Sequence, residues 1–172
     1  MFAVLLVACL VALPGTAGAR AVATELSNVS HPVIYLNLGV HSARLGMTDT
    51  KVRTRVGLTR VKSGKDTSYE GQTVYYACFG RKRAGGYDVK TYSNKKHVVW
   101  MFEINGSAVR TKQGVHVGSS ESSVVSAYGS KVKKTVGDVY TTYTYGAIRG
   151  KGTDFYVRNS THKVTQILVR NW

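Results

Sequence analysis

The residue types that most often carry out catalysis are sparse in this chain. Its five histidines are His31, His41, His97, His116 and His162. They do not have the spacing of metal ligands, so the sequence predicts no metal and no cofactor. Cys78 together with a histidine could form a nucleophilic pair, but no local pattern favours that chemistry. The chain is therefore interpreted as a non-enzymatic protein without catalytic residues, and an enzyme that uses Cys78 is the least favoured alternative.

The charge of the chain favours the binding of anions. There are 24 Lys and Arg residues against 9 Asp and Glu residues, a formal net charge of +15, and both halves of the chain are basic. Two predicted hairpin loops concentrate basic residues, which are Arg81, Lys82, Arg83, Arg149 and Lys151. The planar guanidinium of arginine suits phosphate and carboxylate groups, so the two loops together are predicted to form a binding patch. The alternative is an ordinary solvated charged surface.

Aromatic side chains on predicted strands form a second candidate binding surface. Tyr143 and Tyr145 alternate along one strand, so they share a face of its sheet. Trp100 is assigned to the face away from the helices, and its neighbour Met101 is then expected to point to the core. Exposed Tyr and Trp side chains would provide a recognition surface. The alternative is that these rings fill the core under the helices.

The N-terminal segment predicts an exported protein. Residues 1–19 carry no charge and combine an apolar run with a final Ala17-Gly18-Ala19, a pattern typical of a signal peptide that is cleaved before Arg20. A buried N-terminal helix and a lipoprotein signal at Cys9 are the alternatives. The apolar run is too short to span a bilayer comfortably, so no transmembrane segment is expected after cleavage. The mature protein is predicted to be secreted, periplasmic or part of the cell envelope.

One short motif occurs twice along the chain, which indicates an internal duplication. The copies cover residues 46–57 and 118–129. In each copy a hydroxyl residue at the N-cap precedes an acidic residue, Asp49 or Glu121, and apolar residues follow at a spacing of one helical turn. A glycine then ends the copy, as at many helix C-termini. Each copy is therefore predicted to form a helix of about eight residues that needs a sheet to pack against.

Strand-like segments rich in Tyr, Thr and Val occur in the same order in both copies, one before each predicted helix and four after it. The predicted strands cover residues 33–40, 58–61, 73–79, 87–92 and 97–104 in the first copy, and 109–117, 131–136, 139–145, 153–158 and 163–170 in the second. A polar stretch at 64–71 is predicted to be a loop inserted in the first copy. Asp88 and Asp154 occupy matched positions, where side-chain bonds to the backbone are expected to close a hairpin.

These elements predict an α+β fold of two tandem repeats, each a short helix packed on an antiparallel sheet of about four strands. The expected domains are a signal peptide at residues 1–19, repeat 1 at 20–105 and repeat 2 at 106–172. The sequence leaves open whether the two sheets join at their edges.

The helix motif and the strands that follow it resemble the repeats of the β-lactamase inhibitory protein superfamily. The pattern (Leu or Val)-Gly-x-(Ser or Thr)-(acidic)-x-x-Val-x-x-x-x-Gly spans Leu45–Gly57 and Val117–Gly129. The resemblance implies two helix-plus-sheet units after a signal peptide. Inhibitors of this type carry a disulfide in each unit, whereas here only Cys78 would remain after signal cleavage. The resemblance therefore predicts the fold more specifically than the function.

The sequence favours an exported binding protein that engages a protein partner or an anionic polymer of the cell envelope. The sheet face and the basic hairpins would make the contacts. An inhibitor of an extracellular enzyme, such as a β-lactamase, is the alternative of a different class. Nucleic acid is a less favoured partner, because it is less accessible outside the cytoplasm.

Overall fold

The computed structural model describes residues 31–69 and 72–171. The predicted signal peptide at residues 1–19 and the lipoprotein alternative at Cys9 lie outside the described residues. Strands account for 55% of the structure and helices for 12%, which makes the fold mostly β. The predicted α+β class is therefore wrong.

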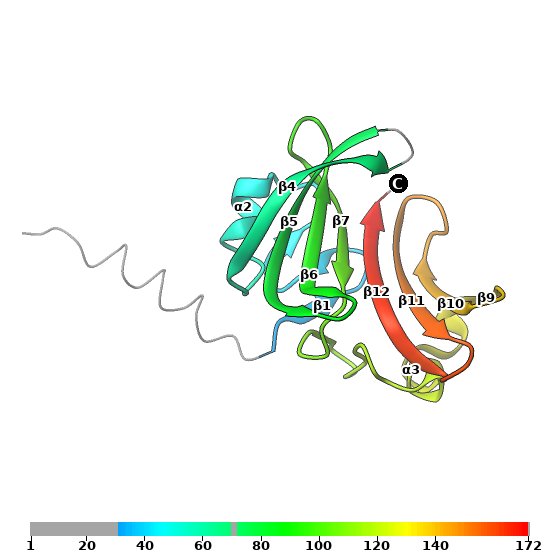
Figure 1. Ribbon diagram of the computed structural model, residues 1–172. Coiled ribbons are helices and arrows are strands. Elements are labelled where there is room, and N and C mark those ends of the chain that lie inside the picture. Colours follow the sequence, from blue (N-terminus) through cyan, green and yellow to red (C-terminus); the bar gives the residue numbers. More distant parts are fainter. Residues whose placement is uncertain (1–30, 70–71, 172) are drawn as a thin grey trace, which may run out of the picture.

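The main element is one eight-stranded antiparallel sheet, called the large sheet (Figure 1). Its strands in spatial order are β4 (Arg60–Tyr69), β5 (Gln72–Arg83), β6 (Gly86–Ser93), β7 (Val99–Ile104), β12 (Lys163–Asn171), β11 (Lys151–Arg158), β10 (Tyr140–Gly146) and β9 (Val132–Val136). The two halves of the sheet join where β7 pairs with β12, with Met101 opposite Arg170 and Ile104 opposite Ile167. The prediction of two tandem helix-plus-sheet repeats is wrong, because the structure has one sheet of eight strands and a second sheet of four rather than a sheet of about four strands in each repeat. The pairing of β7 with β12 also answers the question that the sequence left open, since the two halves join at their edges.

A second sheet consists of four short strands. In spatial order they are β3 (Ala43–Arg44), β2 (Gly39–Val40), β1 (Val33–Tyr35) and β8 (Arg110–Thr111). Strands β1 and β8 are parallel, with Val33 opposite Arg110, so segments on both sides of residue 105 share this sheet. The strand predicted at 33–40 is interrupted, because Asn37 and Gly39 have positive φ angles of 61° and 155° that turn the chain between β1 and β2.

The helices begin where the sequence places them but remain short. The described residues form the α-helices α2 (Asp49–Arg53) and α3 (Glu121–Tyr128) and the 3-10 turn η1 (Gly129–Lys131). The N-caps are Thr48 and Ser120, as predicted. Helix α2 has five residues rather than eight. The N–H of Arg55 donates to the carbonyl of Val52 at 3.0 Å, a tightened turn that ends the helix.

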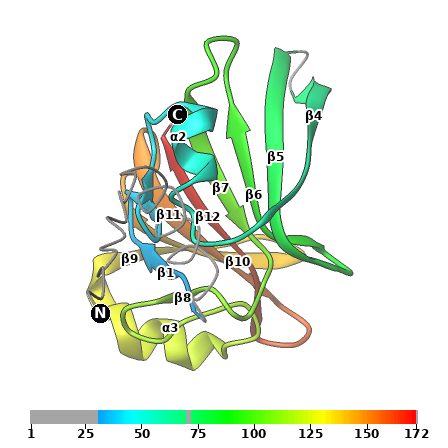
Figure 2. The ribbon, with the colours of Figure 1, turned by 90° about the vertical axis from the view of Figure 1, so that its left-hand side faces the viewer.

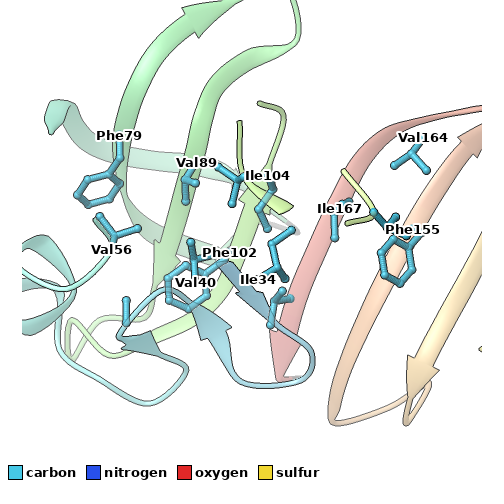
Figure 3. Close-up of a cluster of buried hydrophobic side chains, with 14 of the residues drawn as sticks. Ile34, Val40, Val56, Phe79, Val89, Phe102, Ile104, Phe155, Val164 and Ile167 are labelled. Atoms are coloured by element: carbon cyan, nitrogen blue, oxygen red, sulfur yellow. The ribbon is translucent and has the colours of Figure 1, made fainter. Parts of the chain in front are cut away.

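The main core lies between one face of the large sheet and a layer formed by α2, α3 and the small sheet (Figure 2). Fully buried side chains of the large sheet include Phe79, Phe102, Ile104, Phe155 and Ile167, and the covering layer adds Ile34, Val40 and Val56 (Figure 3). Burial of each such side chain stabilises the fold by about 1.5–3 kcal/mol. This packing commits one face of the large sheet to the core.

Candidate binding face of the large sheet

The other face of the large sheet, called the open face below, carries its own cluster of apolar and aromatic side chains. The buried members are Val74, Tyr92, Met101 and Leu168, and the half-buried rings of Tyr76, Trp100 and Tyr156 pack against them. All of them belong to strands β5, β6, β7, β11 and β12. No helix and no strand of the small sheet, within the described ranges, joins this cluster. In Figure 2, α2 and β1 lie on the core side of β5 and β6, which is the side opposite to the open face.

Lys90 lies at the centre of the aromatic group. Its Nζ lies 4.8 Å from the ring centroid of Tyr76 and 4.4 Å from that of Tyr92, within the range of cation–π interactions. The rings of Tyr92 and Trp100 lie 6.1 Å apart. The pairing of β5 with β6 produces this arrangement, because Tyr76 lies opposite Tyr92 and Cys78 lies opposite Lys90. The open face therefore presents a cation flanked by aromatic rings.

A chain of hydrogen bonds runs across the strands beside Lys90. The hydroxyl of Tyr92 donates to Oε2 of Glu103 at 2.8 Å, and Nδ2 of Asn105 donates to Oε1 of Glu103 at 2.8 Å. Nε2 of Gln166 in turn donates to Oδ1 of Asn105 at 3.3 Å. These bonds cross the junction between β7 and β12, so they fix polar side chains of both halves in one array.

A second aromatic pair continues the open face toward β10. The rings of Tyr140 and Tyr156 meet edge to face at 6.4 Å, and the guanidinium of Arg158 lies 5.6 Å from the Tyr140 ring. Exposed Lys62 at one side of the sheet and exposed Lys133 at the other have this same orientation, since they pair with Cys78 and Thr144. Basic groups thus accompany the rings across most of the sheet.

Two carboxylates at matched positions anchor the strands. Asp88 is buried, and it accepts bonds from the N–H of Arg81 and from Nε of Arg83, both at 2.7 Å. The first of these is the predicted side-chain bond to the hairpin backbone. Asp154 is also buried and instead pairs with Arg170 and Thr144. Both carboxylates act in the structure as anchors of the sheet.

Cys78 points to the open face but is 2% exposed. Burial is the main cause that raises the pKa of its thiol, while the nearby Lys90 and Lys62 oppose that rise. A protonated, buried thiol is a poor nucleophile. Its environment is therefore that of a small apolar side chain.

We expect Cys78 to react with iodoacetamide about a hundredfold more slowly in the folded protein than in urea. The cause is the combination of burial and a raised thiol pKa. Mass spectrometry of the peptide that contains Cys78 measures this reaction separately from that of any other cysteine. Equal labelling rates in the folded and unfolded protein would contradict the prediction.

The basic hairpins lie at opposite ends of the large sheet (Figure 1). Arg81 and Lys82 lie in the last part of β5 rather than in a loop, and the β5–β6 turn that follows adjoins the end of β7 that carries Ile104. The β10–β11 loop adjoins the end of β12, because Lys151 pairs with Asn171. Since β7 and β12 are antiparallel, the two loops point apart, and the predicted single patch of Arg81, Lys82, Arg83, Arg149 and Lys151 does not form. Arg83 is also engaged with Asp88.

The predicted aromatic residues divide between the two faces. Trp100 lies on the open face, where it was placed, but Met101 lies there too. Side chains therefore do not alternate between the two faces at this point of β7. The cause is a shift in the register between β6 and β7, since Tyr92 pairs with Met101 but Ser93 pairs with Val99. Tyr143 and Tyr145 share a face as predicted, but it is the core face, where Tyr143 is 4% exposed and Tyr145 packs on Tyr128. They contribute nothing to the open face.

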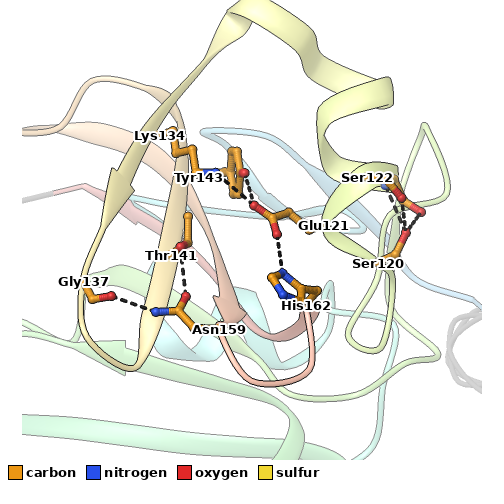
Figure 4. A network of polar contacts seen from close by, with 10 residues as sticks. Ser120, Glu121, Ser122, Lys134, Gly137, Thr141, Tyr143, Asn159 and His162 are labelled. Carbon is orange, nitrogen blue, oxygen red and sulfur yellow. Dashed lines mark hydrogen bonds and ion pairs between the residues drawn. The ribbon is translucent and has the colours of Figure 1, made fainter.

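Tyr143 belongs to a polar cluster around Glu121, the first residue of α3 (Figure 4). Its hydroxyl donates to Oε1 of Glu121. Nζ of Lys134 lies 3.2 Å from the same oxygen, and Nδ1 of His162 lies 2.8 Å from Oε2. The bond from Tyr143, followed by those from His162 and Lys134, lowers the pKa of Glu121 to about 2. The cluster ties the start of α3 to the large sheet.

Helix α2 has a similar attachment, and neither attachment was predicted from the sequence. The carboxylate of Asp49 accepts a bond from the hydroxyl of Ser93 at 2.9 Å and lies 3.1 Å from Nδ1 of His97. His97 and His162 both have positive φ angles, and each backbone carbonyl accepts a bond from the first helical N–H. The sequence does contain a pattern that could have predicted both attachments. In each copy the first helical residue is acidic, and a histidine stands in the turn before the last strand.

We expect the Glu121 cluster to make stability depend on pH between 4.5 and about 2. Because folding lowers the pKa of Glu121, its ion pairs stabilise the folded state above pH 4.5, and this contribution is lost as the pH falls through the folded pKa. Since the side chain is partly exposed, Glu121→Gln should lower the free energy of unfolding near neutral pH by about 1 kcal/mol. Urea titrations should show this difference shrinking toward zero at the acid end. A difference that stays constant over the range would contradict the prediction.

Within residues 31–69 and 72–171, none of the helices has the length and apolar composition needed to span a bilayer. Within the same residues, no group of three or more His, Cys, Asp or Glu side chains has the arrangement of a metal site.

Comparison with known proteins shows the fold but not the function. No protein-family model matches the chain, and no curated protein matches it. The crystal structure of the uncharacterized protein yfeY from Escherichia coli matches with a TM-score of 0.53 at 15% identity, over 78% of this chain and 97% of that one. An extracellular protein containing a SCP domain from Bacillus anthracis str. Ames matches with a TM-score of 0.50 at 11% identity, over 74% of this chain and 44% of that one. The resemblance to the β-lactamase inhibitory protein superfamily stays a prediction.

Proposed function

We propose that this chain is an exported, non-enzymatic binding protein whose open face engages an extended anionic polysaccharide of the cell envelope. The observation that carries the proposal is Lys90 between the rings of Tyr76 and Tyr92, beside Trp100. Aromatic rings offer flat apolar surfaces on which the C–H faces of sugar rings can pack. The ammonium group supplies the charge that attracts a carboxylate or phosphate on the same polymer.

The distribution of basic groups supports an extended ligand over a compact one. Lys62, Lys90 and Lys133 lie on the open face, and the basic hairpins lie at opposite ends of the sheet. A polymer laid across the face would meet positive charge along its path and at both ends. The net charge of +15 would in addition speed association with any polyanion.

The reactive side chains support binding rather than catalysis. Asp88, Asp154 and Glu121 hold structural ion pairs. Cys78 is buried with a raised thiol pKa. Export is supported by the predicted signal peptide, and one of the structural neighbours is an extracellular protein.

The test compares the affinity of the protein for four defined polymers. Polygalacturonate carries sugar rings and charge, dextran carries rings without charge, poly(glycerol phosphate) carries charge without rings, and poly(dT) represents single-stranded nucleic acid. We expect the tightest binding to polygalacturonate, and about tenfold weaker binding after Trp100→Ala or Lys90→Ser, because each change removes one well-formed contact.

The matched control is Lys65→Ser. Lys65 pairs with Tyr75 in the same half of the sheet, but it occupies the alternate position and so points to the other face. Lys65→Ser removes the same charge as Lys90→Ser and should leave the affinity for polygalacturonate unchanged. Equal losses of affinity in Lys65→Ser and Lys90→Ser would mean that net charge alone accounts for the binding. No binding to any polyanion would overturn the proposal, and tighter binding to poly(dT) with the same dependence on Trp100 would identify the face as a nucleic-acid surface instead.

A further inference from the structure

Two loops that are distant in the sequence meet at the β10–β11 end of the molecule. The N–H of Asn37, in the β1–β2 turn, donates to Oγ1 of Thr153 in β11 at 2.8 Å. Gly146, at the start of the β10–β11 loop, lies so close that an added Cβ would be 2.4 Å from Nδ2 of Asn37. The two loops therefore form one feature of the surface.

Each of these loops exposes a large aliphatic side chain. Leu38 is 48% exposed and Ile148 is 51% exposed. The other large hydrophobic residues that are exposed in the described chain are valines, namely Val61, Val125, Val136 and Val139. The two largest of these exposed aliphatic side chains thus come from the same two touching loops. Each side chain is about half exposed, and the loops that carry them meet at Asn37, which contacts Thr153 and Gly146.

Basic residues flank the exposed aliphatic pair, and acidic residues are missing from both loops. Arg149 and Lys151, one and three residues after Ile148, are exposed, and neither 36–38 nor 147–151 contains Asp or Glu. Leu38, Ile148, Arg149 and Lys151 are together called the tip. Exposed aliphatic side chains with basic residues close by in the chain are a composition that suits the interface of an anionic bilayer.

The framework below holds the β10–β11 loop in place. Nη1 of Arg170, itself 3% exposed, donates to the carbonyl of Gly150 at 3.1 Å. The N–H of Ala147 donates to the carbonyl of Lys151 at 3.1 Å, which closes the loop on itself. Because the loop is preorganised, Ile148 stays at the surface and does not fold back into the core.

We infer that the tip is a membrane-docking site, which inserts Leu38 and Ile148 into the interface of an anionic bilayer while Arg149 and Lys151 bind headgroup phosphates. The occupant is a lipid surface rather than a free phosphate, because two exposed aliphatic side chains have no role in binding a soluble anion. The site is separate from the open face and does not depend on the function proposed for it.

Hydrogen exchange measured by mass spectrometry on the full chain tests the inference locally. Vesicles of phosphatidylcholine containing about one third phosphatidylglycerol should slow amide exchange in residues 36–39 and 147–151 about tenfold. Vesicles of phosphatidylcholine alone should have little effect. The β9–β10 turn at 137–139 serves as an internal reference and should not change. Vesicle binding through the apolar segment at the N-terminus would not by itself protect the two tip loops.

The variant Leu38→Ser with Ile148→Ser should abolish the protection. Val136→Ser with Val139→Ser removes two side chains that are 69% and 57% exposed elsewhere, and it should retain the protection. Unchanged exchange in the native protein, or protection that survives the loss of Leu38 and Ile148, would overturn the inference. Equal protection by soluble glycerol phosphate would overturn it as well, since the site would then bind a free phosphate.

Discussion

Replacement of Arg170 by methionine is expected to lower the free energy of unfolding by about 3–5 kcal/mol, because it leaves a buried carboxylate without its cation. The side chains of Arg170 and Asp154 are each 3% exposed. The guanidinium contacts both carboxylate oxygens, with Nη2 at 3.1 Å from Oδ1. The hydroxyl of Thr144 still donates to Asp154 at 2.7 Å, but a neutral donor cannot replace the charge. Urea unfolding followed by tryptophan fluorescence measures the change.

The matched control for this prediction is Arg83→Met. Arg83 also pairs with a buried aspartate, but through Nε alone, its side chain is 39% exposed, and the N–H of Arg81 continues to hold Asp88. The expected loss is therefore about 1 kcal/mol or less. Similar losses for Arg83→Met and Arg170→Met would contradict the argument from burial.

A double variant separates the cost of an orphaned charge from the value of the ion pair. Arg170→Met with Asp154→Leu removes both charges, so it should be more stable than Arg170→Met alone. The double variant could instead lose as much free energy of unfolding as the two single variants together. The stabilisation by Arg170 would then come from its bond to Gly150 and from the packing of its aliphatic stem.

The local elements were largely predictable, because they depend on short-range patterns. Both N-caps were found at Thr48 and Ser120, and the apolar residues assigned to the helix faces, such as Val52 and Val124, are buried. Strands β6, β10, β11 and β12 lie close to their predicted ranges. These patterns of caps and of β-branched and aromatic residues act within a few neighbours.

The arrangement of the elements was not predictable in the same way, because it depends on partners that are distant in the sequence. The polar stretch at 64–71 was expected to be a loop, yet β4 continues through Lys65 and Asp66, since these residues pair with Tyr75 and Val74. Composition alone argued against a strand there, and the hydrogen-bonded ladder with β5 outweighed it. The pairing of β7 with β12, which the sequence left open, has no local signal at all.

The candidate site was also predictable only in part, in its residue types but not in their arrangement. The abundance of Tyr, Trp and Lys pointed to a binding face, but membership of that face depends on strand register. The bulge between Tyr92 and Ser93 reverses the alternation near Met101. Lys90 lies between two rings only because β5 and β6 pair in one register. A shift by one residue would have placed it on the core face, so no count of residues along the chain could have found it.

Substitution of Gly39 by alanine is expected to lower the free energy of unfolding by about 2–4 kcal/mol, since it forces a steric conflict with the backbone. An added Cβ would lie 2.1 Å from the carbonyl oxygen of Ala43 and 2.9 Å from Cα of Arg44. The φ angle of 155° is also one that side chains other than glycine rarely adopt. Relief would require β2 to separate from β3, and this would expose Val40 and Ala43, which are fully buried in the core.

Gly85→Ala is the matched control, because it adds the same methyl group in the β5–β6 loop. An added Cβ there meets no atom within 4 Å, so the free energy of unfolding should change by about 0.5 kcal/mol or less. Thermal and urea unfolding of both variants, compared with the native chain, measure the two effects. If Gly39→Ala proves as stable as Gly85→Ala, the close approach of β2 and β3 does not constrain this position, and the small sheet tolerates separation of its strands. A large loss confined to Gly39→Ala would mean that the small sheet is an integral part of the covering layer, on which the core face of the large sheet depends.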